Sequence, residues 1–404
     1  MKRDIFVICD MEIKSIRKAK KLTGKKVLLR ADFNVPVNIK GEVKDDFKIL
    51  ASLPTIRFLL RYKCRIIIIT HLGRPQSNSD SKIKKVKCCS VKHIGAHLSR
   101  LLNKKVKFIN DCVGFKVGTE VSKIKAGEIL ILENLRFHKA EMENSKKFAR
   151  ELASLADIYV NDAFGVSHRK HASLSAIKNY IPSYAGILLE NEVKNLSKAL
   201  NPKQPLLTVL GGAKLATKIS LIKNLHKKSF RILIGGALAS IFFAAHNLEI
   251  GKSLIDKASV KLAKKFKDKS IILPIDVIVS DSSMEKAQVK SISGINKNDI
   301  ILDIGPQTIK LYSSYIRKAK TIIWNGPMGM FENERFKHGT LGIACAIASR
   351  SVGQAYGIAG GGETVKALRA MKMIDYIDWV STGGGAMLAF LGKERLPGLN
   401  KIVN

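Results

Sequence analysis

The sequence predicts an α/β protein with two domains, each built around its own parallel sheet, and three observations lead to this fold class. Short apolar runs rich in β-branched residues recur without alternation, as expected for strands buried on both faces of a parallel sheet. Each run precedes a glycine-rich or polar turn and then a helical pattern, which is typical of α/β architecture. The length of 404 residues is sufficient for two or three domains.

The predicted strands fall into two series. Those of the first half precede polar turns: Val27–Leu29 before RADFNVP, Ile66–Ile69 before THLGRP, Ile129–Leu132 before ENLRFH and Ile158–Val160 before NDAFG. Those of the second half mostly precede glycine-rich turns: Leu206–Leu210 before GGAK, Ile232–Ile234 before GGA, the longer apolar stretch Ile271–Val279, Thr321–Trp324 before NGPMG, Tyr356–Ala359 before GGGET and Trp379–Val380 before STGGGA.

One predicted helix joins the two halves of the chain. Residues Ala185–Leu200 carry apolar side chains at helical spacing, and Asn201-Pro202 is a stop signal for that helix. The lysine-rich segment Ser81–Lys87 is expected to be a solvated loop. We therefore expect a domain boundary near residue 185.

Composition excludes several classes of protein. A hydrophobic content of 46% with 25% charged residues is that of a globular chain and excludes wholesale disorder. Six cysteines without a CxxC pair indicate neither a disulfide framework nor a zinc site, and favour a reducing compartment. The longest apolar stretch, Ile232 to Ala245, is shorter than the roughly 20 residues of a membrane span. We expect a cytoplasmic protein with no membrane partner.

The strong positive charge does not by itself indicate nucleic-acid binding. The 70 Lys+Arg against 33 Asp+Glu give a net charge of +37, but 53 of the basic residues are lysines scattered along the chain. Aromatic residues are only 6% and do not alternate with basic ones as in stacking platforms. We expect a solvated, lysine-rich surface that attracts anionic substrates and has no specific nucleic-acid partner.

The turns after the first series of strands carry basic and polar side chains. Ligands of open α/β sheets bind at the carboxyl ends of the strands, so these turns are candidate binding loops. They hold Asp32 and Asn34, His71 and Arg74, Arg136, and His168, Arg169 and His171. Because guanidinium groups bind phosphate in a bidentate manner, several arginines on different strands point to a small phosphorylated anion.

The turns after the second series are suited to the phosphates of a nucleotide. Glycines at strand-to-helix turns let backbone N–H groups approach phosphates at a helix N-terminus. Lys214, the last residue of GGAK, and Lys218 lie four residues apart at the start of one predicted helix and can face the same phosphates. No Walker A, GxGxxG or protein-kinase motif is present. The two halves together suggest phosphoryl transfer across a cleft, and the lack of an obvious base fits a carboxylate nucleophile.

Eight motifs together resemble those of the phosphoglycerate kinase family. They are RADFNVP (30–36), HLGRP (71–75), LENLRFH (132–138), NDAFG with HRKHAS (161–173), GGAK (211–214), WNGPMGMFE (324–332), GGGET (360–364) and STGGGA (381–386). The resemblance implies two similar-sized Rossmann-like domains with parallel sheets, hinged around a central cleft, in a monomer. It also implies reversible phosphoryl transfer between 1,3-bisphosphoglycerate and MgADP, giving 3-phosphoglycerate and MgATP, with Mg2+ carried on the nucleotide.

The same resemblance implies domain boundaries. Residues 1–184 would bind phosphoglycerate, residues 185–200 would form the interdomain helix, and residues 201–390 would bind the nucleotide. Residues 391–404 would pack back on the first domain.

Residue roles follow from the resemblance by position. The phosphoglycerate would be held by Asp32, Asn34, Lys48, His71, Arg74, Arg136 and Arg169. The residues expected to act on the transferring phosphoryl group are Lys48, Lys214 and Arg169. Glu332 would bind the ribose, and the remaining nucleotide site would comprise Lys214, Lys218, Gly235, Gly236, Asn325, Gly360, Gly361, Gly362, Glu363 and Thr364, with Glu363 toward the metal.

Three positions depart from the family pattern. Lys48 stands where the family has Arg, Glu363 where it has Asp, and Ala237 where it has the third glycine of a turn. Lysine donates from one point and lacks the planar fork of arginine, so Lys48 is expected to slow the reaction. The alternative is a weak or inactive member of the family that binds polyanions.

Three other features have ordinary structural interpretations. His93 and His97 have the spacing of metal ligands on a helix, but no third ligand is evident, and an ordinary amphipathic helix is favoured. Cys112 is expected to be a small buried residue. Trp324 is expected to pack in the core.

Overall fold

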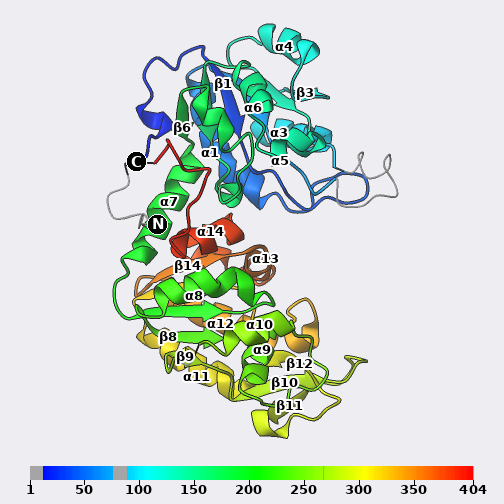
Figure 1. The fold of residues 1–404 in the computed structure, drawn as a ribbon, viewed down its shortest axis with the longest axis vertical. Helices are drawn as coiled ribbons and strands as arrows, with labels where there is room; N and C mark the ends of the chain where they lie inside the picture. Colours follow the sequence, from blue (N-terminus) through cyan, green and yellow to red (C-terminus); the bar gives the residue numbers. More distant parts are fainter. Residues whose placement is uncertain (1–11, 76–88, 267, 404) are drawn as a thin grey trace. The chain divides into compact units, whose positions relative to one another are not determined.

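The computed structural model describes residues 12–75, 89–266 and 268–403, and the predicted loop Ser81–Lys87 lies outside them. The chain divides into two compact units (Figure 1). Unit 1 consists of Met1–Lys194 and Arg395–Asn404, and unit 2 of Asn195–Glu394. The fold class predicted from the strand pattern is confirmed, since each unit contains a six-stranded parallel sheet.

The sheet of unit 1 has the order β3-β4-β2-β1-β5-β6. Its strands are β1 (Lys26–Arg30), β2 (Arg65–Ile69), β3 (Val106–Ile109), β4 (Ile129–Leu132), β5 (Ile158–Asn161) and β6 (Ser183–Ala185). Four of the six correspond to predicted strands, and their apolar residues are buried because helices cover both faces. The short edge strands β3 and β6 were not predicted.

The helices of unit 1 alternate with the strands. They are α1 (Phe47–Arg61), α3 (Lys92–Leu102), α4 (Phe115–Ser122), α5 (Lys139–Met142), α6 (Lys146–Ala153) and α7 (Ile187–Leu200), whose last residues belong to unit 2. Helix α6 illustrates the local signals: the Ser145 hydroxyl caps it by accepting from the Phe148 N–H, and Phe148 and Leu152 are buried at helical spacing.

The predicted joining helix begins two residues later than expected. Ala185 is the last residue of β6, and helix α7 starts at Ile187. The strand and the helix are separated by Gly186, where a Cβ atom would overlap the Asp162 carboxylate. That carboxylate accepts hydrogen bonds from the N–H groups of Leu188 and Leu189, at 3.0 and 3.3 Å, and so caps the first turn of α7.

The C-terminal segment, Arg395–Val403, packs on unit 1. The Asn161 side chain at the end of β5 donates to the carbonyl of Gly398 at 2.9 Å. Ile402 is fully buried, and its carbonyl accepts from Lys14, whose own carbonyl accepts from Ala185 in β6. This backbone pairing covers the edge of the sheet at β6, which would otherwise expose unpaired N–H and C=O groups.

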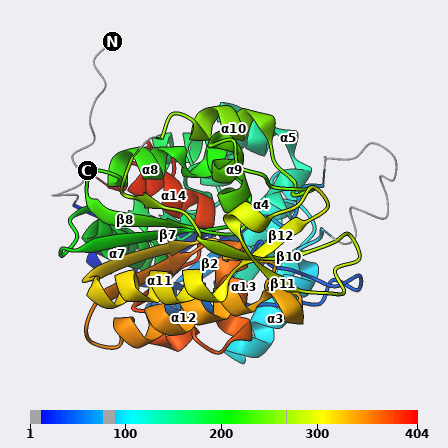
Figure 2. The ribbon, with the colours of Figure 1, turned by 90° about the horizontal axis from the view of Figure 1, so that it is seen from below.

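The main sheet of unit 2 has the order β15-β14-β13-β7-β8-β9. Its strands are β7 (Leu206–Leu210), β8 (Ser229–Ile234), β9 (Ile271–Ile272), β13 (Thr321–Asn325), β14 (Tyr356–Gly360) and β15 (Trp379–Ser381). Figure 2 shows helices on both faces: α8 (Ile219–Leu225), α9 (Ala237–Ala245), α10 (Lys257–Ala263) and α14 (Gly384–Leu391) on one, and α11 (Pro306–Lys318), α12 (His338–Ser351) and α13 (Gly362–Ala370) on the other.

A second, three-stranded antiparallel sheet in unit 2 was not predicted. It has the order β11-β10-β12, with β10 (Asp276–Ser280), β11 (Gln288–Ser291) and β12 (Ile300–Ile304). The apolar stretch Ile271–Val279 is therefore divided between two sheets. Pro274 lies between β9 and β10, where a residue without an N–H cannot continue a ladder.

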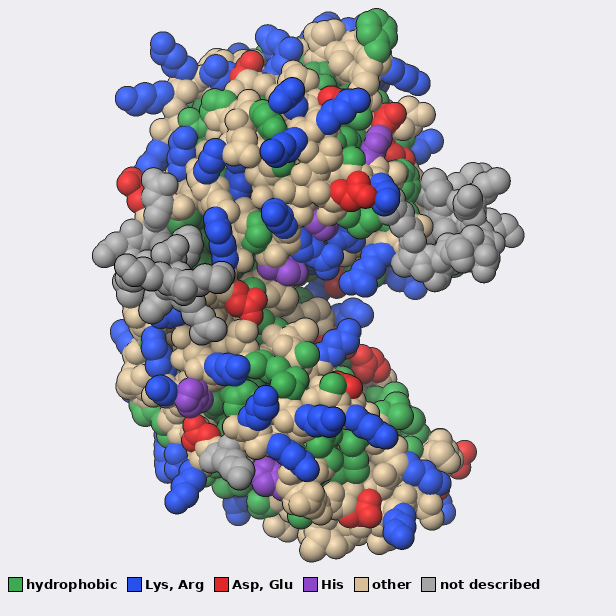
Figure 3. Space-filling view, viewed as in Figure 1, with side chains coloured by type: hydrophobic (Ala, Val, Ile, Leu, Met, Phe, Trp, Pro, Cys, Tyr) green, Lys and Arg blue, Asp and Glu red, His purple; other side chains and the backbone are tan. Residues whose placement is uncertain are grey.

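The surface is rich in lysine, as predicted. Figure 3 shows Lys and Arg side chains spread over the visible face of each unit, with few acidic side chains among them. No helix within the described residues has both the length and the apolar character needed to cross a membrane.

Candidate active site

The predicted binding loops of unit 1 lie at one edge of its sheet. Strand β1 has β2 on one side and β5 on the other, so the chain order reverses at β1. This switch point is where open α/β sheets bind ligands. Arg30, the last residue of β1, pairs with Ile69 of β2 and Asn161 of β5, which brings the loops after all three strands together.

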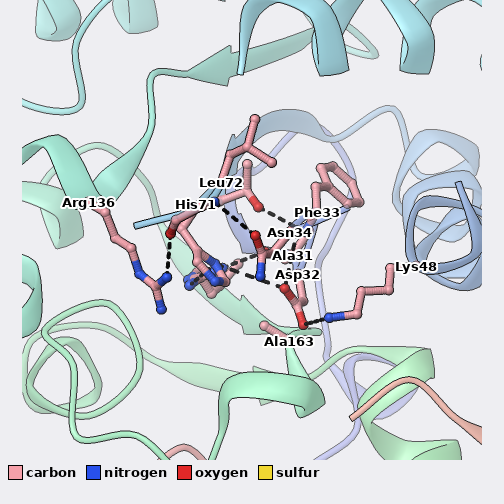
Figure 4. Close-up of polar contacts among 12 residues, drawn as sticks. Ala31, Asp32, Phe33, Asn34, Lys48, His71, Leu72, Arg136 and Ala163 are labelled. Atoms are coloured by element: carbon pink, nitrogen blue, oxygen red, sulfur yellow. Dashed lines mark hydrogen bonds and ion pairs between the residues drawn. The ribbon is translucent and has the colours of Figure 1, made fainter. Parts of the chain in front are cut away.

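Asp32 lies at the centre of this edge (Figure 4). Its carboxylate accepts a hydrogen bond from the Lys48 ammonium at 2.8 Å and lies 4.0 Å from His71 Nδ1. Burial alone would raise the pKa of Asp32, but the charges of Lys48 and Arg30 and the hydrogen bond from Lys48 hold it well below its ordinary value. Asp32 is therefore a fixed negative charge that positions the Lys48 ammonium.

Arg30 is a functional candidate that the sequence analysis missed. Its side chain is only 1% exposed and donates to the Ser173 hydroxyl at 3.0 Å. It also lies 3.2 Å from His71 Nδ1, and burial together with the Arg30 charge lowers the pKa of His71 well below its usual value. His71 is thus a neutral imidazole, and its buried Nε2 has no hydrogen-bond partner within the described part of the chain.

Arg136 is held in place by the loop that precedes it. The Asn134 side chain accepts from the Arg136 N–H at 3.0 Å and donates to the carbonyl of Leu72, which ties this loop to the one after β2. The Arg136 guanidinium donates to the Gly73 carbonyl at 2.6 Å. Burial and the charges of Arg169 and Arg30 lower the pKa of Arg136 to about 10.

Arg169 and Arg74 belong to the same cationic group. Burial and the neighbouring Arg74 charge lower the pKa of Arg169, and its buried Nε atom has no hydrogen-bond partner among the described residues. Burial and the charges of Arg136, Arg30 and Arg169 also lower the pKa of His171 to about 4. Each of these lowered pKa values is the mark of positive charges that lack compensation.

Asn34 connects two of the binding loops. Its side-chain oxygen accepts from the Gly73 N–H at 2.9 Å, and its own N–H donates to Asp32. The structure therefore brings the predicted residues of unit 1 into one site. Such a group of guanidinium and ammonium groups around a carboxylate is suited to an anion with more than one negative charge.

The predicted glycine turns of unit 2 pack against one another. A Cβ atom on Gly211 would overlap the carbonyl oxygen of Pro327, and one on Gly236 would lie 2.7 Å from the Gly212 nitrogen. Gly326 has φ +96°, and a Cβ atom there would overlap Gly211. Close backbone packing therefore requires glycine at these turns, whether or not a phosphate binds.

Gly362 has no such structural requirement. Its φ lies outside the left-handed region, and a Cβ atom there would meet no described atom within 4 Å. It is the first residue of α13, where the helix has free N–H groups and positive potential. The open backbone at Gly362 suits the approach of a phosphate.

Asn325 and Thr364 hold the turns together. The Asn325 side chain donates to the Gly360 carbonyl at 2.6 Å, and the Thr364 hydroxyl accepts from the Gly326 N–H at 2.7 Å. Both side chains are buried. The predicted nucleotide residues Gly235, Gly236, Gly360 and Gly361 belong to this set of turns, and Glu332 is exposed on the loop after β13.

Lys214 and Lys218 differ in their surroundings. The segment between them is a 3-10 helix, Leu215–Lys218, that precedes α8, so the two side chains are not on one α-helix as expected. Lys214 is exposed and Lys218 is buried. Burial and the Lys214 charge lower the pKa of Lys218, while the carboxylate of Glu363 opposes that shift. A Cβ atom on Gly212 would lie 3.5 Å from Glu363 and 3.9 Å from the Lys218 ammonium, so these groups surround one turn.

The interpretations of the other candidate residues are supported by their contacts. His97 lies on helix α3, 3.3 Å from the Asp46 carboxylate, and no cluster of three metal-ligating side chains occurs among residues 12–75, 89–266 and 268–403. Cys112 is buried, and burial raises the pKa of its thiol. Trp324 is buried in the core of unit 2.

An anion site on one parallel sheet and phosphate-suited turns on another are the features that an α/β phosphotransferase needs. The phosphoglycerate kinase family model matches residues 16–394. Phosphoglycerate kinase of Coprothermobacter proteolyticus is 41% identical over 400 residues, covering 97% of this chain and 99% of that protein. The protein of the same name from Dictyoglomus turgidum is 44% identical over 387 residues, covering 94% and 95%.

Solved structures of phosphoglycerate kinases are also similar to this chain. Phosphoglycerate kinase from Coxiella burnetii has a TM-score of 0.80 at 38% identity, covering 96% of this chain and 98% of that one. The structure from Pyrococcus horikoshii OT3 has a TM-score of 0.84 at 31% identity, covering 95% and 97%. The chain belongs to the phosphoglycerate kinase family. It is a phosphotransferase that carries out the glycolytic transfer between 1,3-bisphosphoglycerate and ADP, and nothing in these similarities favours the alternative of an inactive polyanion-binding protein.

Proposed function

We propose that unit 1 binds the phosphoglycerate and unit 2 the nucleotide, with the residues described above in defined roles. The observation that carries this proposal is the group of cations at the edge of the unit 1 sheet, where burial and neighbouring cations lower the pKa values of Arg136 and Arg169 despite the Asp32 carboxylate. An anion that enters this site gains from several charges at once. A phosphorylated carboxylic acid, with charge at both ends, can contact several of these cations at once.

Within unit 1, we assign Arg74, Arg136 and Arg169 to the phosphate and carboxylate groups of phosphoglycerate. Asn34 and His71 supply polar contacts, and Asp32 positions the Lys48 ammonium through their 2.8 Å hydrogen bond. The neutral state of His71 prevents it from adding to the repulsion among the arginines. In this assignment Lys48 and Arg169 stabilise charge on the transferring phosphoryl group.

Within unit 2, we assign Lys214 and Lys218 to the nucleotide phosphates, with Lys214 nearest to the transferring group. Gly235, Gly236, Gly360, Gly361 and Gly362 line the phosphate site, Asn325 and Thr364 fix the turns, and Glu332 binds the ribose. The exposed position of Lys214 leaves its ammonium free to move with the phosphoryl group, whereas buried Lys218 supplies a fixed charge.

The substrate nucleotide carries Mg2+, which neutralises phosphate charge when bound. Magnesium usually keeps several waters and uses one or two protein carboxylates, so a single acidic residue at the turn fits this ion. Glu363 is in the first turn of α13 and near Gly212 and Lys218, and we assign it to the metal side of the nucleotide.

The transfer itself needs no protein base. In the direction of ATP synthesis, a β-phosphate oxygen of ADP bonds to the phosphorus of the acyl phosphate, and the phosphorus–oxygen bond to the acyl group breaks. The leaving group is a carboxylate, which is ionised at neutral pH and takes no proton. The residues therefore act by positioning and by charge stabilisation, as in other phosphoryl transfers.

We further propose a cytoplasmic monomer in which residues 1–184 and 201–390 are the two substrate-binding domains. Residues 185–200 form the helix between them. Of the expected C-terminal segment 391–404, residues up to Glu394 belong to unit 2, and the part from Arg395 packs on the first domain. Direct transfer requires that the two bound substrates come within bonding distance of each other.

A coupled assay of 3-phosphoglycerate phosphorylation by MgATP tests the proposal. Arg136→Gln removes one charge-assisted hydrogen bond to the phosphoglycerate and is expected to raise its KM by about 10- to 150-fold. Lys214→Met is expected to lower kcat with a smaller effect on that KM. If both variants keep the kinetic constants of the unsubstituted protein, the assignment of the site is overturned. If the unsubstituted protein has no activity, the proposed reaction is overturned.

A further inference from the structure

A second cationic pocket lies within unit 1 and is lined by residues other than those assigned above. It has a volume of about 380 Å³ and lies between the segment Lys170–Asn179 and the C-terminal segment. Four of its lining side chains are cations, Lys170, Lys178, Arg395 and Lys401. No carboxylate is among the described residues that line it.

Lys178 is the buried part of this pocket. Only 6% of it is exposed, and its ammonium donates to the Pro397 carbonyl at 2.7 Å. An ammonium has three N–H donors, so this one can donate to a ligand as well as to Pro397. Burial and the nearby Lys401 charge lower the pKa of Lys178 to about 7. The site therefore contains a buried amine whose charged form has no carboxylate beside it among the described lining residues.

The other cations come from elements that are far apart in the sequence. The Lys401 ammonium donates to the Asn179 side chain at 2.7 Å, which fixes it at the pocket. Arg395 belongs to the C-terminal segment, whereas Lys170 follows Arg169 directly. Among the described residues, none of the four cations forms an ion pair with a carboxylate. Folding has thus gathered like charges that repel one another.

We propose that this pocket binds a small anion that bears at least two charges on phosphate groups. Its volume is at the lower end of the range of small-molecule sites, which excludes a whole nucleic acid or a folded partner from it. Arg395 supplies the planar fork suited to a phosphate, and the lysines supply point charges. The bound anion offsets the cost of burying Lys178 and ties the C-terminal segment to the loop at Lys170.

Hydrogen exchange of the C-terminal segment tests this proposal. The N–H groups of Gly398, Leu399 and Ile402 are hydrogen-bonded within unit 1, so their exchange reports the opening of the segment. Pyrophosphate at ten times its dissociation constant should slow their exchange about tenfold. The double variant R395Q/K401Q, at two exposed positions, should lose this protection while remaining folded. Comparison of pyrophosphate with glycerol 3-phosphate then indicates whether the ligand is inorganic or organic.

Two controls separate the pocket from the substrate site and from salt. Arg136→Gln, in the substrate site, should retain the protection by pyrophosphate, and sodium chloride at equal ionic strength should not produce it. The proposal is overturned if the C-terminal segment exchanges at the same rate with pyrophosphate. It is equally overturned if R395Q/K401Q keeps the protection, or if Arg136→Gln abolishes it, since the effect then arises elsewhere. The phosphotransfer assay is independent of this outcome.

Discussion

Lys48 lies at the start of α1 with its ammonium 2.8 Å from the Asp32 carboxylate, and the resemblance to the family leads us to expect Arg at this position. An ammonium that is already paired has fewer donors left for a transferring phosphoryl group than a guanidinium would have. Of the three departures from the family pattern, Lys48 is therefore the one expected to affect the rate of phosphoryl transfer most.

Lys48→Arg is expected to raise kcat for phosphorylation of 3-phosphoglycerate. The guanidinium can keep one N–H on Asp32 and present another to the phosphoryl group, and one charge-assisted hydrogen bond corresponds to about 10- to 150-fold in rate. Lys48→Met, which removes the charge, is the matched control and should lower kcat. A decrease in the Lys48→Arg variant would mean that the surrounding residues have adapted to lysine.

Arg30 shows the limit of sequence analysis at the scale of single residues. Asp32, His71 and Arg136 could be predicted as neighbours because the carboxyl ends of parallel strands meet at one edge. Arg30 could not, because its burial depends on Ser173, which is 143 residues away. Nothing in the local sequence distinguishes a buried strand-end arginine from an exposed one.

At the scale of elements, the capping of α7 by Asp162 gives the folded protein a pH dependence. Burial raises the pKa of Asp162 to about 7, against about 4 in an unfolded chain. The folded state therefore holds a proton that the unfolded state releases. The stability associated with this group is fully present below pH 4 and is lost as the pH rises through 7.

Asp162→Asn should remove this loss of stability. The amide keeps an oxygen that can accept from the N–H groups of Leu188 and Leu189 and does not ionise. Urea unfolding at pH 5 and pH 8 should show that the variant loses less stability than the unsubstituted protein, by on the order of 1–4 kcal/mol. Asp157→Asn, at an exposed aspartate that accepts from the Lys26 N–H, is the control. Parallel pH profiles for the Asp162 variant and the unsubstituted protein would contradict the argument.

The glycine turns of unit 2 serve close backbone packing at some positions and access for a phosphate at others. One substitution of each kind can separate the two effects. Gly211→Ala would overlap the Pro327 carbonyl and is expected to destabilise the protein by about 2–4 kcal/mol. Gly362→Ala meets open space and should leave stability unchanged, yet its methyl group stands beside the free N–H groups of α13 and should raise the KM for MgATP several-fold. Thermal unfolding and steady-state kinetics measure both effects. An unchanged KM in Gly362→Ala would place the phosphates elsewhere.

The elements that the sequence did not predict share a physical cause. Strands β3 and β6 are short edge strands, and β11 is largely exposed, so none of them needs a continuous apolar run. The interior strands, such as β4 and β7, are buried on both faces, and burial imposes the pattern that made them predictable. The 3-10 helix Leu215–Lys218 that precedes α8 was missed for another reason, because residue spacing alone does not distinguish it from an α-helical turn.

At the scale of the whole molecule, the C-terminal segment makes the stability of unit 1 depend on residues distant in sequence. Ile402→Ala removes a fully buried side chain and is expected to destabilise unit 1 by about 2–5 kcal/mol. Both tryptophans, Trp324 and Trp379, belong to unit 2, so their fluorescence follows unit 2 alone. Hydrogen exchange in β1 and β5 should therefore increase in this variant, while the fluorescence transition changes little.

Ile347→Ala in unit 2 is the matched control for Ile402→Ala, because it also removes a fully buried isoleucine. It should shift the fluorescence transition to lower urea concentration. If Ile402→Ala shifts the fluorescence transition as much as Ile347→Ala does, the two units unfold together and the separation of their stabilities is wrong.

The return of the C-terminal segment to unit 1 has a consequence for the newly made chain. A ribosome releases the residues of unit 1 up to Lys194 first, then all of Asn195–Glu394, and only afterwards the segment from Arg395 that completes unit 1. Unit 2 is continuous and can fold as soon as it emerges, whereas the edge at β6 lacks its full covering until the last residues appear. During translation the first part to be made is thus the last to be finished.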